Sequence, residues 1–119
     1  MDNIETIVIA WLKTVAGDYE VHGDIPKDRP DKFITMDRTG GPRESMVLDR
    51  AEILIEVYDR NSRLDCSQKA NEIGDRVIEL LAYDDITRAK VNSTVNLGDP
   101  IGSFQRYQVY VDVWYRRDV

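Results

Sequence analysis

The residues that could carry out acid–base or nucleophilic chemistry are few and isolated. His22 is the single histidine and Cys66 the single cysteine among 119 residues. A catalytic base needs a reacting partner and a group that orients it, and no nucleophile motif lies near His22. We therefore interpret His22 as a solvated surface residue. Cys66 opens the apolar stripe of a predicted helix, which favours a small buried core residue over an activated thiolate. We expect no catalytic residue and no enzymatic activity.

Metal and phosphate sites are not indicated either. Three pairs of acidic residues are close in sequence: Asp84 with Asp85, Asp28 with Asp31, and Asp49 with Glu52. A dedicated Ca²⁺ or Mg²⁺ site needs several converging oxygen ligands, and none of these pairs has the spacing of a calcium-binding loop. Gly40-Gly41 lacks the glycine and lysine pattern of a phosphate-binding loop, so it predicts a flexible hairpin tip. We expect no metal and no cofactor.

Composition indicates one compact domain that spans residues 1–119. Hydrophobic residues make up 42% of the chain, which is enough for a modest core. The formal net charge of -6 argues against tight binding to a nucleic-acid backbone. No apolar run approaches the roughly 20 residues that span a bilayer. The first five residues lack the basic start of a signal peptide, and a single cysteine excludes an internal disulfide, so we expect a reducing compartment.

Two segments have the spacing of amphipathic helices. The first covers residues 3–16, with Asn3 as its cap and Gly17 where a left-handed stop is needed. The second begins at Ser62 or Asp65 and is expected to run to about Ala82. Its predicted apolar stripe consists of Cys66, Ala70, Ile73, Val77, Leu80 and Leu81.

The remaining segments predict strands and turns. Strands are expected at residues 32–37, 47–59 and 86–97, and a closing strand begins near Gln105. A short stretch at residues 19–25 precedes residues 26–31, whose two prolines predict a loop or a ragged edge strand. Turns are expected at residues 39–43 and 98–102. The simplest assembly is an α+β fold, a mainly antiparallel sheet of four to five strands with two helices packed on one face.

The closing strand alternates strictly, as a half-buried strand does. Its inward face is predicted to hold Tyr107, Val109, Val111, Val113 and Tyr115. Its outward face is predicted to hold Gln108, Tyr110, Asp112, Trp114 and Arg116. Large aromatic side chains among charges, on a face that the helices leave uncovered, are typical of a surface that contacts another protein.

The same face extends to the strand at residues 47–59 if the two strands share their phase. Leu54 and Tyr58 would then lie beside Tyr110 and Trp114, unless a loop or the N-terminal region of the same chain covers them. Arginines lie beside the Gly40-Gly41 tip and at the end of the closing strand. We interpret them as partners for acidic residues on a neighbouring subunit and not as contacts to DNA phosphates. The predicted contact residues are Arg38, Gly40, Gly41, Arg43, Leu54, Tyr58, Tyr110, Trp114 and Arg116.

The order of these features resembles the tail terminator (tail completion) proteins of long-tailed bacteriophages. An N-terminal amphipathic helix is followed by Ile25-Pro26, by the segment at residues 30–35 and by the Thr39-Gly40-Gly41 turn. The long strand at residues 51–58 comes next, then a helix that contains Ala70. Gly98-Asp99-Pro100 and the Arg106-Tyr107 strand complete the pattern.

The resemblance implies a structural virion protein at the head–tail junction, assembled in the host cytoplasm. Such proteins form a hexameric ring on the tail tube, end its polymerisation and join it to the head. The implied partners are further copies of the chain, the major tail tube protein and a head–tail connector or head-completion protein. DNA would pass through the lumen without specific binding, and no membrane is involved. The alternatives are another neck or connector protein and a small non-enzymatic bacterial binding module.

Overall fold

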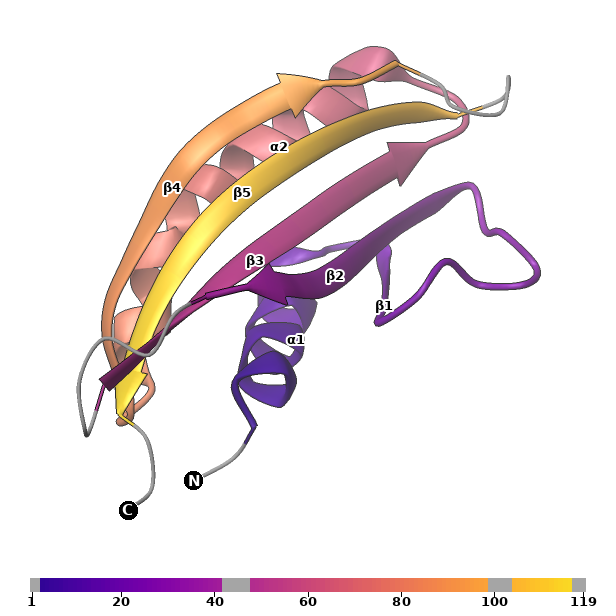
Figure 1. The fold of residues 1–119 in the computed structure, drawn as a ribbon. Helices are drawn as coiled ribbons and strands as arrows, with labels where there is room; N and C mark the ends of the chain where they lie inside the picture. The colour runs from indigo at the N-terminus through magenta and orange to yellow at the C-terminus, as the bar shows by residue number, and fades with distance from the viewer. Residues whose placement is uncertain (1–2, 42–47, 99–103, 117–119) are drawn as a thin grey trace.

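The computed structural model describes residues 3–41, 48–98 and 104–116 of the chain. In these ranges the strands form a single curved five-stranded sheet, accompanied by the helices (Figure 1). The elements are α1 (Ile4–Val15), β1 (Glu20–His22), β2 (Lys32–Gly40), β3 (Leu48–Asp59), α2 (Arg63–Arg76), the 3₁₀ helix η1 (Val77–Ala82), β4 (Ile86–Asn96) and β5 (Gln105–Arg116).

Helix α1 begins and ends where the sequence predicts. The side chain of Asn3 accepts a hydrogen bond of 2.7 Å from the backbone N–H of Glu5, which satisfies one free donor of the first turn. Gly17 follows the helix with φ of +62°, a conformation that a residue without a Cβ adopts at little cost. Lys13 in the last turn complements the negative end of the helix.

The second predicted helix is α-helical over only part of its length. Ser62 caps it by accepting from the backbone N–H of Asp65 at 3.1 Å, as expected. The α-helix ends at Arg76, and the chain continues to Ala82 as η1. Because a 3₁₀ helix has about three residues per turn, Val77 and Leu80 lie on one side and are both buried. Leu81 is turned outward and is 41% exposed, so its prediction as a stripe residue is wrong.

The sheet is mainly antiparallel, which confirms the predicted fold class. Its strand order in the described residues is β1-β2-β3-β5-β4, and each neighbouring pair is antiparallel except β1 with β2. Residues 26–31 form no strand, so the loop interpretation holds for them. Strand β2 extends through Gly40 into the predicted turn at residues 39–43. Residues 42–43 of that turn, and residues 99–102 of the next, lie outside the described residues.

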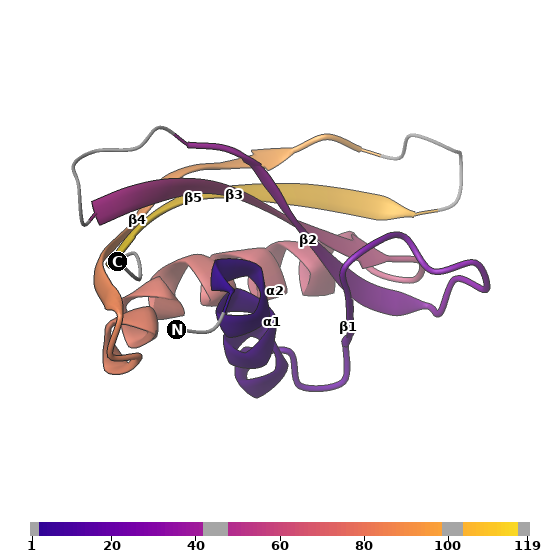
Figure 2. The ribbon, with the colours of Figure 1, turned by 60° about the horizontal axis from the view of Figure 1, so that its bottom comes forward.

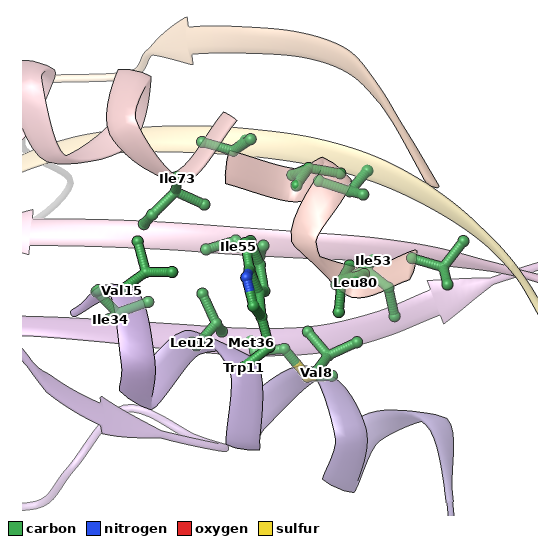
Figure 3. Packing of buried hydrophobic residues seen from close by; sticks show 14 of the residues in the cluster. Val8, Trp11, Leu12, Val15, Ile34, Met36, Ile53, Ile55, Ile73 and Leu80 are labelled. Atoms are coloured by element: carbon green, nitrogen blue, oxygen red, sulfur yellow. The ribbon is translucent and has the colours of Figure 1, made fainter. Parts of the chain in front are cut away.

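Both helices pack on one face of the sheet, as Figure 2 shows. The predicted inward residues of β3 and β5 form the floor of this core, and the alternation of the two strands is confirmed by their burial. Trp11 of α1 inserts between the layers, beside Ile55 and Leu12 (Figure 3). Its indole N–H donates to Glu79 of η1 at 3.2 Å, so the largest core side chain also satisfies its polar atom.

Candidate functional site

The sheet face opposite the helices, called the open face below, is built by β3 and β5 in unbroken register. Leu54 lies directly opposite Tyr110, and Arg50 directly opposite Trp114. The shared phase that the sequence left open is therefore confirmed. Leu54, Tyr110 and Trp114 are all half-buried, because each contacts its cross-strand neighbours while one side remains accessible. These three residues give the open face its apolar character.

Charged side chains between these apolar residues are tied to one another. Glu56 accepts hydrogen bonds from Arg106 and Gln108, both at 3.2 Å, and all three belong to the β3–β5 pair. Nearer the other end of the pair, Arg50 lies 3.5 Å from Glu52. Ion pairs that are already made within the chain fix side-chain positions before any partner arrives, which lowers the entropy lost on binding.

Trp114 is covered on one side by a cation from the edge strand. The guanidinium carbon of Arg88 in β4 lies 4.6 Å from the centre of the Trp114 ring system. This cation–π contact orients the indole and is worth roughly 0.5–1 kcal/mol at an exposed site. Arg88 was not among the predicted contact residues. Its position opposite Trp114 in the β4–β5 register depends on a bulge that alternation alone does not reveal.

A small hollow of about 170 Å³ opens on the same face. Its polar wall includes Asp112, which is buried and accepts a hydrogen bond of 2.7 Å from the side-chain amide of Asn92. The lining residues are Thr39, Glu52, Asn92, Ser93, Tyr110, Val111 and Asp112. The volume is below the roughly 300 Å³ at which cofactor and drug-sized pockets begin. It is large enough for a single side chain.

Tyr58 does not belong to the accessible part of the open face. It stacks on Phe33 with ring centres 4.4 Å apart, and Phe104 packs edge-on against both rings. Only 2% of Tyr58 is exposed. The alternative that the same chain covers the face is therefore correct at this end of β3. We leave Tyr58 out of the proposed contact surface, and neither Phe33 nor Phe104 was recognised from the sequence as its cover.

The predicted contact residues near the hairpin tip are divided between the two faces. Arg38 lies on the helix side, with its guanidinium 5.7 Å from the Tyr115 ring and its Nε donating to the carbonyl of Gly40 at 3.3 Å. Gly41 has φ of +127°, and a Cβ there would collide with the backbone carbonyl of Arg50, so glycine is required. Arg116 is exposed at the end of β5. Arg43 lies outside the described residues.

Cys66 is a core residue, as predicted. Its thiol is fully buried and donates to the carbonyl of Val57 at 3.2 Å. Burial, and secondarily the negative charge of Asp59, raises the pKa of Cys66 to about 12, so the thiolate needed for nucleophilic attack does not form near neutral pH. His22 is half-buried in β1 and lies 3.2 Å from the exposed carboxylate of Glu20.

A buried polar cluster that the sequence did not indicate joins β3 to α2. The Asp59 carboxylate has no exposed area; it accepts from the Tyr19 hydroxyl at 2.7 Å and from the backbone N–H groups of Asn61 and Ser62 at 2.8 and 3.0 Å. Burial, followed by the bond to Asp59, raises the pKa of Tyr19 well above its usual range. Three donors compensate the buried carboxylate, so the cluster serves the fold.

The described residues contain no group of three or more His, Cys, Asp or Glu side chains that could hold a metal ion. In the same ranges, no helix combines the length and the apolar character needed to cross a bilayer. No protein-family model matches the chain, and no curated protein matches it in sequence.

Proposed function

We propose that the chain is a structural assembly protein of the tail terminator type, which forms a ring on the end of a phage tail tube. The observation that carries the proposal is the accessible row of Leu54, Tyr110 and Trp114 on the open face. Both helices pack on the other face, and all three side chains of the row stay partly accessible, with Arg88 over one side of Trp114. A half-exposed aromatic row among pre-paired charges suits a protein–protein contact.

A ring requires two different and complementary surfaces on each subunit, because each copy contacts its neighbours in head-to-tail fashion. The open face supplies one candidate surface, and the two unlike margins of the sheet supply others. The resemblance in the order of sequence motifs adds the biological role. In this role the ring ends tube polymerisation, joins the tube to the head and resides in the virion after assembly in the host cytoplasm.

The excess of acidic over basic residues supports a ring lumen that does not retain DNA. A net charge of -6 repels the phosphate backbone, so DNA would pass through the ring without specific binding. The proposed partners are further copies of the chain, the major tail tube protein and a connector or head-completion protein. Another neck or connector protein would have the same features, so this identity is the main alternative for the chain. A small non-enzymatic bacterial binding module would use the same open face for a peptide or another ligand.

Mass measurement in solution and tube capping test the proposal together. We expect sedimentation velocity to detect a hexamer, either for the protein alone or after addition of tail tubes assembled from a phage tail tube protein. Electron microscopy should show tubes that carry the ring at one end and stop growing. A protein that remains monomeric and leaves tube length unchanged would refute the proposal. Neighbouring genes for tube and neck proteins would separate a phage role from a bacterial binding module.

A further inference from the structure

The sheet has a free margin on each side within the described residues. β4 pairs with β5 on one side only. At the other margin β1 pairs with residues 33–35 of β2, which leaves residues 36–40 of β2 without a strand beyond them. Figure 1 shows β4 and the β1–β2 pair at opposite margins. An unpaired edge presents backbone donors and acceptors that another strand can extend.

The β4 margin carries a cation that is not used within the described part of the chain. Lys90 is exposed and faces Asp112 across the β4–β5 pair. The Asp112 carboxylate is held by Asn92 at 2.7 Å and approached by Arg50 at 4.0 Å, and Lys90 makes no ion pair with a described residue. Its ammonium group therefore projects from the open face at the edge of the sheet.

The β2 margin carries a matching anion. Asp37 is exposed on the open face, and its cross-strand neighbour in β3 is Leu54, which offers no charge. Asp37 makes no ion pair with any described residue. The next residue, Arg38, lies on the helix side against Tyr115. The two margins thus hold opposite charges on the same face of the sheet.

We propose that β4 of one copy pairs with residues 36–39 of β2 in the next copy, so that the sheet continues across the subunit boundary. This inference rests on the proposed ring and names one of its subunit contacts. Neighbouring strands from β2 to β4 alternate in direction, so copies arranged head to tail bring these edges together in antiparallel fashion. A register with Asp37 opposite Lys90 places Arg88 on the diagonal, within reach of the same carboxylate.

The same register is consistent with the alternation of both strands. It places Met36 opposite Val91, and both point to the helix side, where Met36 is buried and Val91 packs against the core. A register shifted by one residue would place Asp37 against this apolar row, which is unfavourable. Helix η1 packs beside β4 on the helix side, and its Ile78 is 61% exposed.

Charge reversal and its rescue test the pairing. We expect Asp37→Lys and Lys90→Glu each to weaken self-association by about tenfold per contact, since each replaces an attraction with a like-charge contact. The double variant, D37K with K90E, exchanges the two charges and should restore association to within a few-fold of the unaltered chain. Sedimentation velocity over a wide concentration range measures all of these changes.

Controls carry the same charge changes away from both margins. Asp75→Lys on the exposed side of α2 matches Asp37→Lys in net charge, and Lys13→Glu on the exposed side of α1 matches Lys90→Glu. Both controls should associate as the unaltered chain does, and thermal melting should show that every variant folds.

The outcomes separate this inference from the proposed function. A ring whose mass and affinity are unchanged by either reversal would refute the edge pairing and leave the ring standing. A two-fold dimer would also refute the pairing, as would a ring that forms only on tail tubes and is unaffected by both reversals. Tube capping would then decide the proposed function separately. Loss in both single variants with recovery in the double variant would support the edge pairing.

Discussion

Cys66 illustrates how burial alters a titratable side chain. Its thiol lies between β3 and α2 and donates to a backbone carbonyl, while its pKa rises from an ordinary value of 9.0 to about 12. The folded state therefore keeps a proton that the unfolded chain releases above pH 9. The stabilisation from this thiol is complete below pH 9 and is lost progressively as the pH rises from 9 toward 12.

We predict that Cys66 is unreactive toward a disulfide reagent at pH 8 until the protein unfolds. Between pH 8 and pH 10 its titration should remove about 1 kcal/mol of the free energy of unfolding. Urea titrations at both pH values measure this loss, and Cys66→Ala provides the control because it lacks the titrating group. Rapid labelling of the folded protein would contradict the assignment of Cys66 to the core.

Tyr19 and Asp59 form the second residue-scale test. Replacing Tyr19 with Phe removes one donor from a carboxylate that has no exposed area, which should cost about 1–3 kcal/mol in unfolding free energy. Tyr110→Phe is the matched control, because the Tyr110 hydroxyl makes no hydrogen bond to the described residues and lies half-exposed. Chemical denaturation should therefore distinguish the two variants. Equal losses of unfolding free energy in the two variants would mean that the hydrogen bond from Tyr19 to Asp59 does not stabilise the fold.

At the scale of elements, strand alternation and helix-capping residues are the sequence features that best predict where helices and strands lie. The phase of β5 follows from its period of two, and α1 follows from its stripe together with Asn3 and Gly17. The change from α2 to η1 was not predictable, because Val77 and Leu80 fit either helical period. Strand β1 has only three residues, too few for a pattern, and its parallel pairing arises from tertiary packing.

The proposed contact surface was predictable in part, because strand alternation determines which residues share a face. The phase of β3 and β5 places Leu54, Tyr110 and Trp114 together correctly. The burial of Tyr58 depends on Phe104, which is distant in sequence and precedes the closing strand. No periodic signal connects such residues. The presence of two phenylalanines near strand ends was the one available hint.

We predict different effects when each of the two tryptophans is truncated to alanine, one on stability and the other on assembly. Trp11 is buried in the core, so Trp11→Ala should cost about 3–5 kcal/mol in stability and threaten folding itself. Trp114 is half-exposed on β5, so Trp114→Ala should cost less than about 1.5 kcal/mol and weaken assembly more than folding. Thermal melting and sedimentation measure the two effects separately. A large loss of stability in Trp114→Ala would show that it serves the core.

At the scale of the whole molecule, one apolar cluster joins every layer. Residues from α1, α2, η1 and the sheet belong to the same core cluster (Figure 3). The expectation of a single domain leads to a clear prediction. We expect one cooperative thermal transition, with tryptophan fluorescence and far-ultraviolet circular dichroism changing at the same temperature. Two separated transitions would indicate two independent units.

The strand order is the part of the whole-molecule architecture that the sequence could not supply. β5 lies between β3 and β4, so the strand that comes last in the described chain is an interior strand of the sheet. Its apolar inward face and aromatic outward face are compatible with either a central or an edge position. In the structure α2 packs against β5 and η1 packs against β4, which lies at the margin.

Strand β3 is covered on both faces at one end and on one face at the other. Near Tyr58 it lies between the helices and the Phe33–Phe104 aromatic pair, whereas near Glu52 only the helix side is packed. The strand should therefore be stiff at its carboxyl end and compliant at its amino end. Amide hydrogens should exchange with solvent more slowly around Val57 than around Glu52. A partner that docks at Trp114 would then contact the compliant end, where the sheet can adjust its twist. The packing of Tyr58 with Phe33 and Phe104 would keep the carboxyl end of the strand fixed.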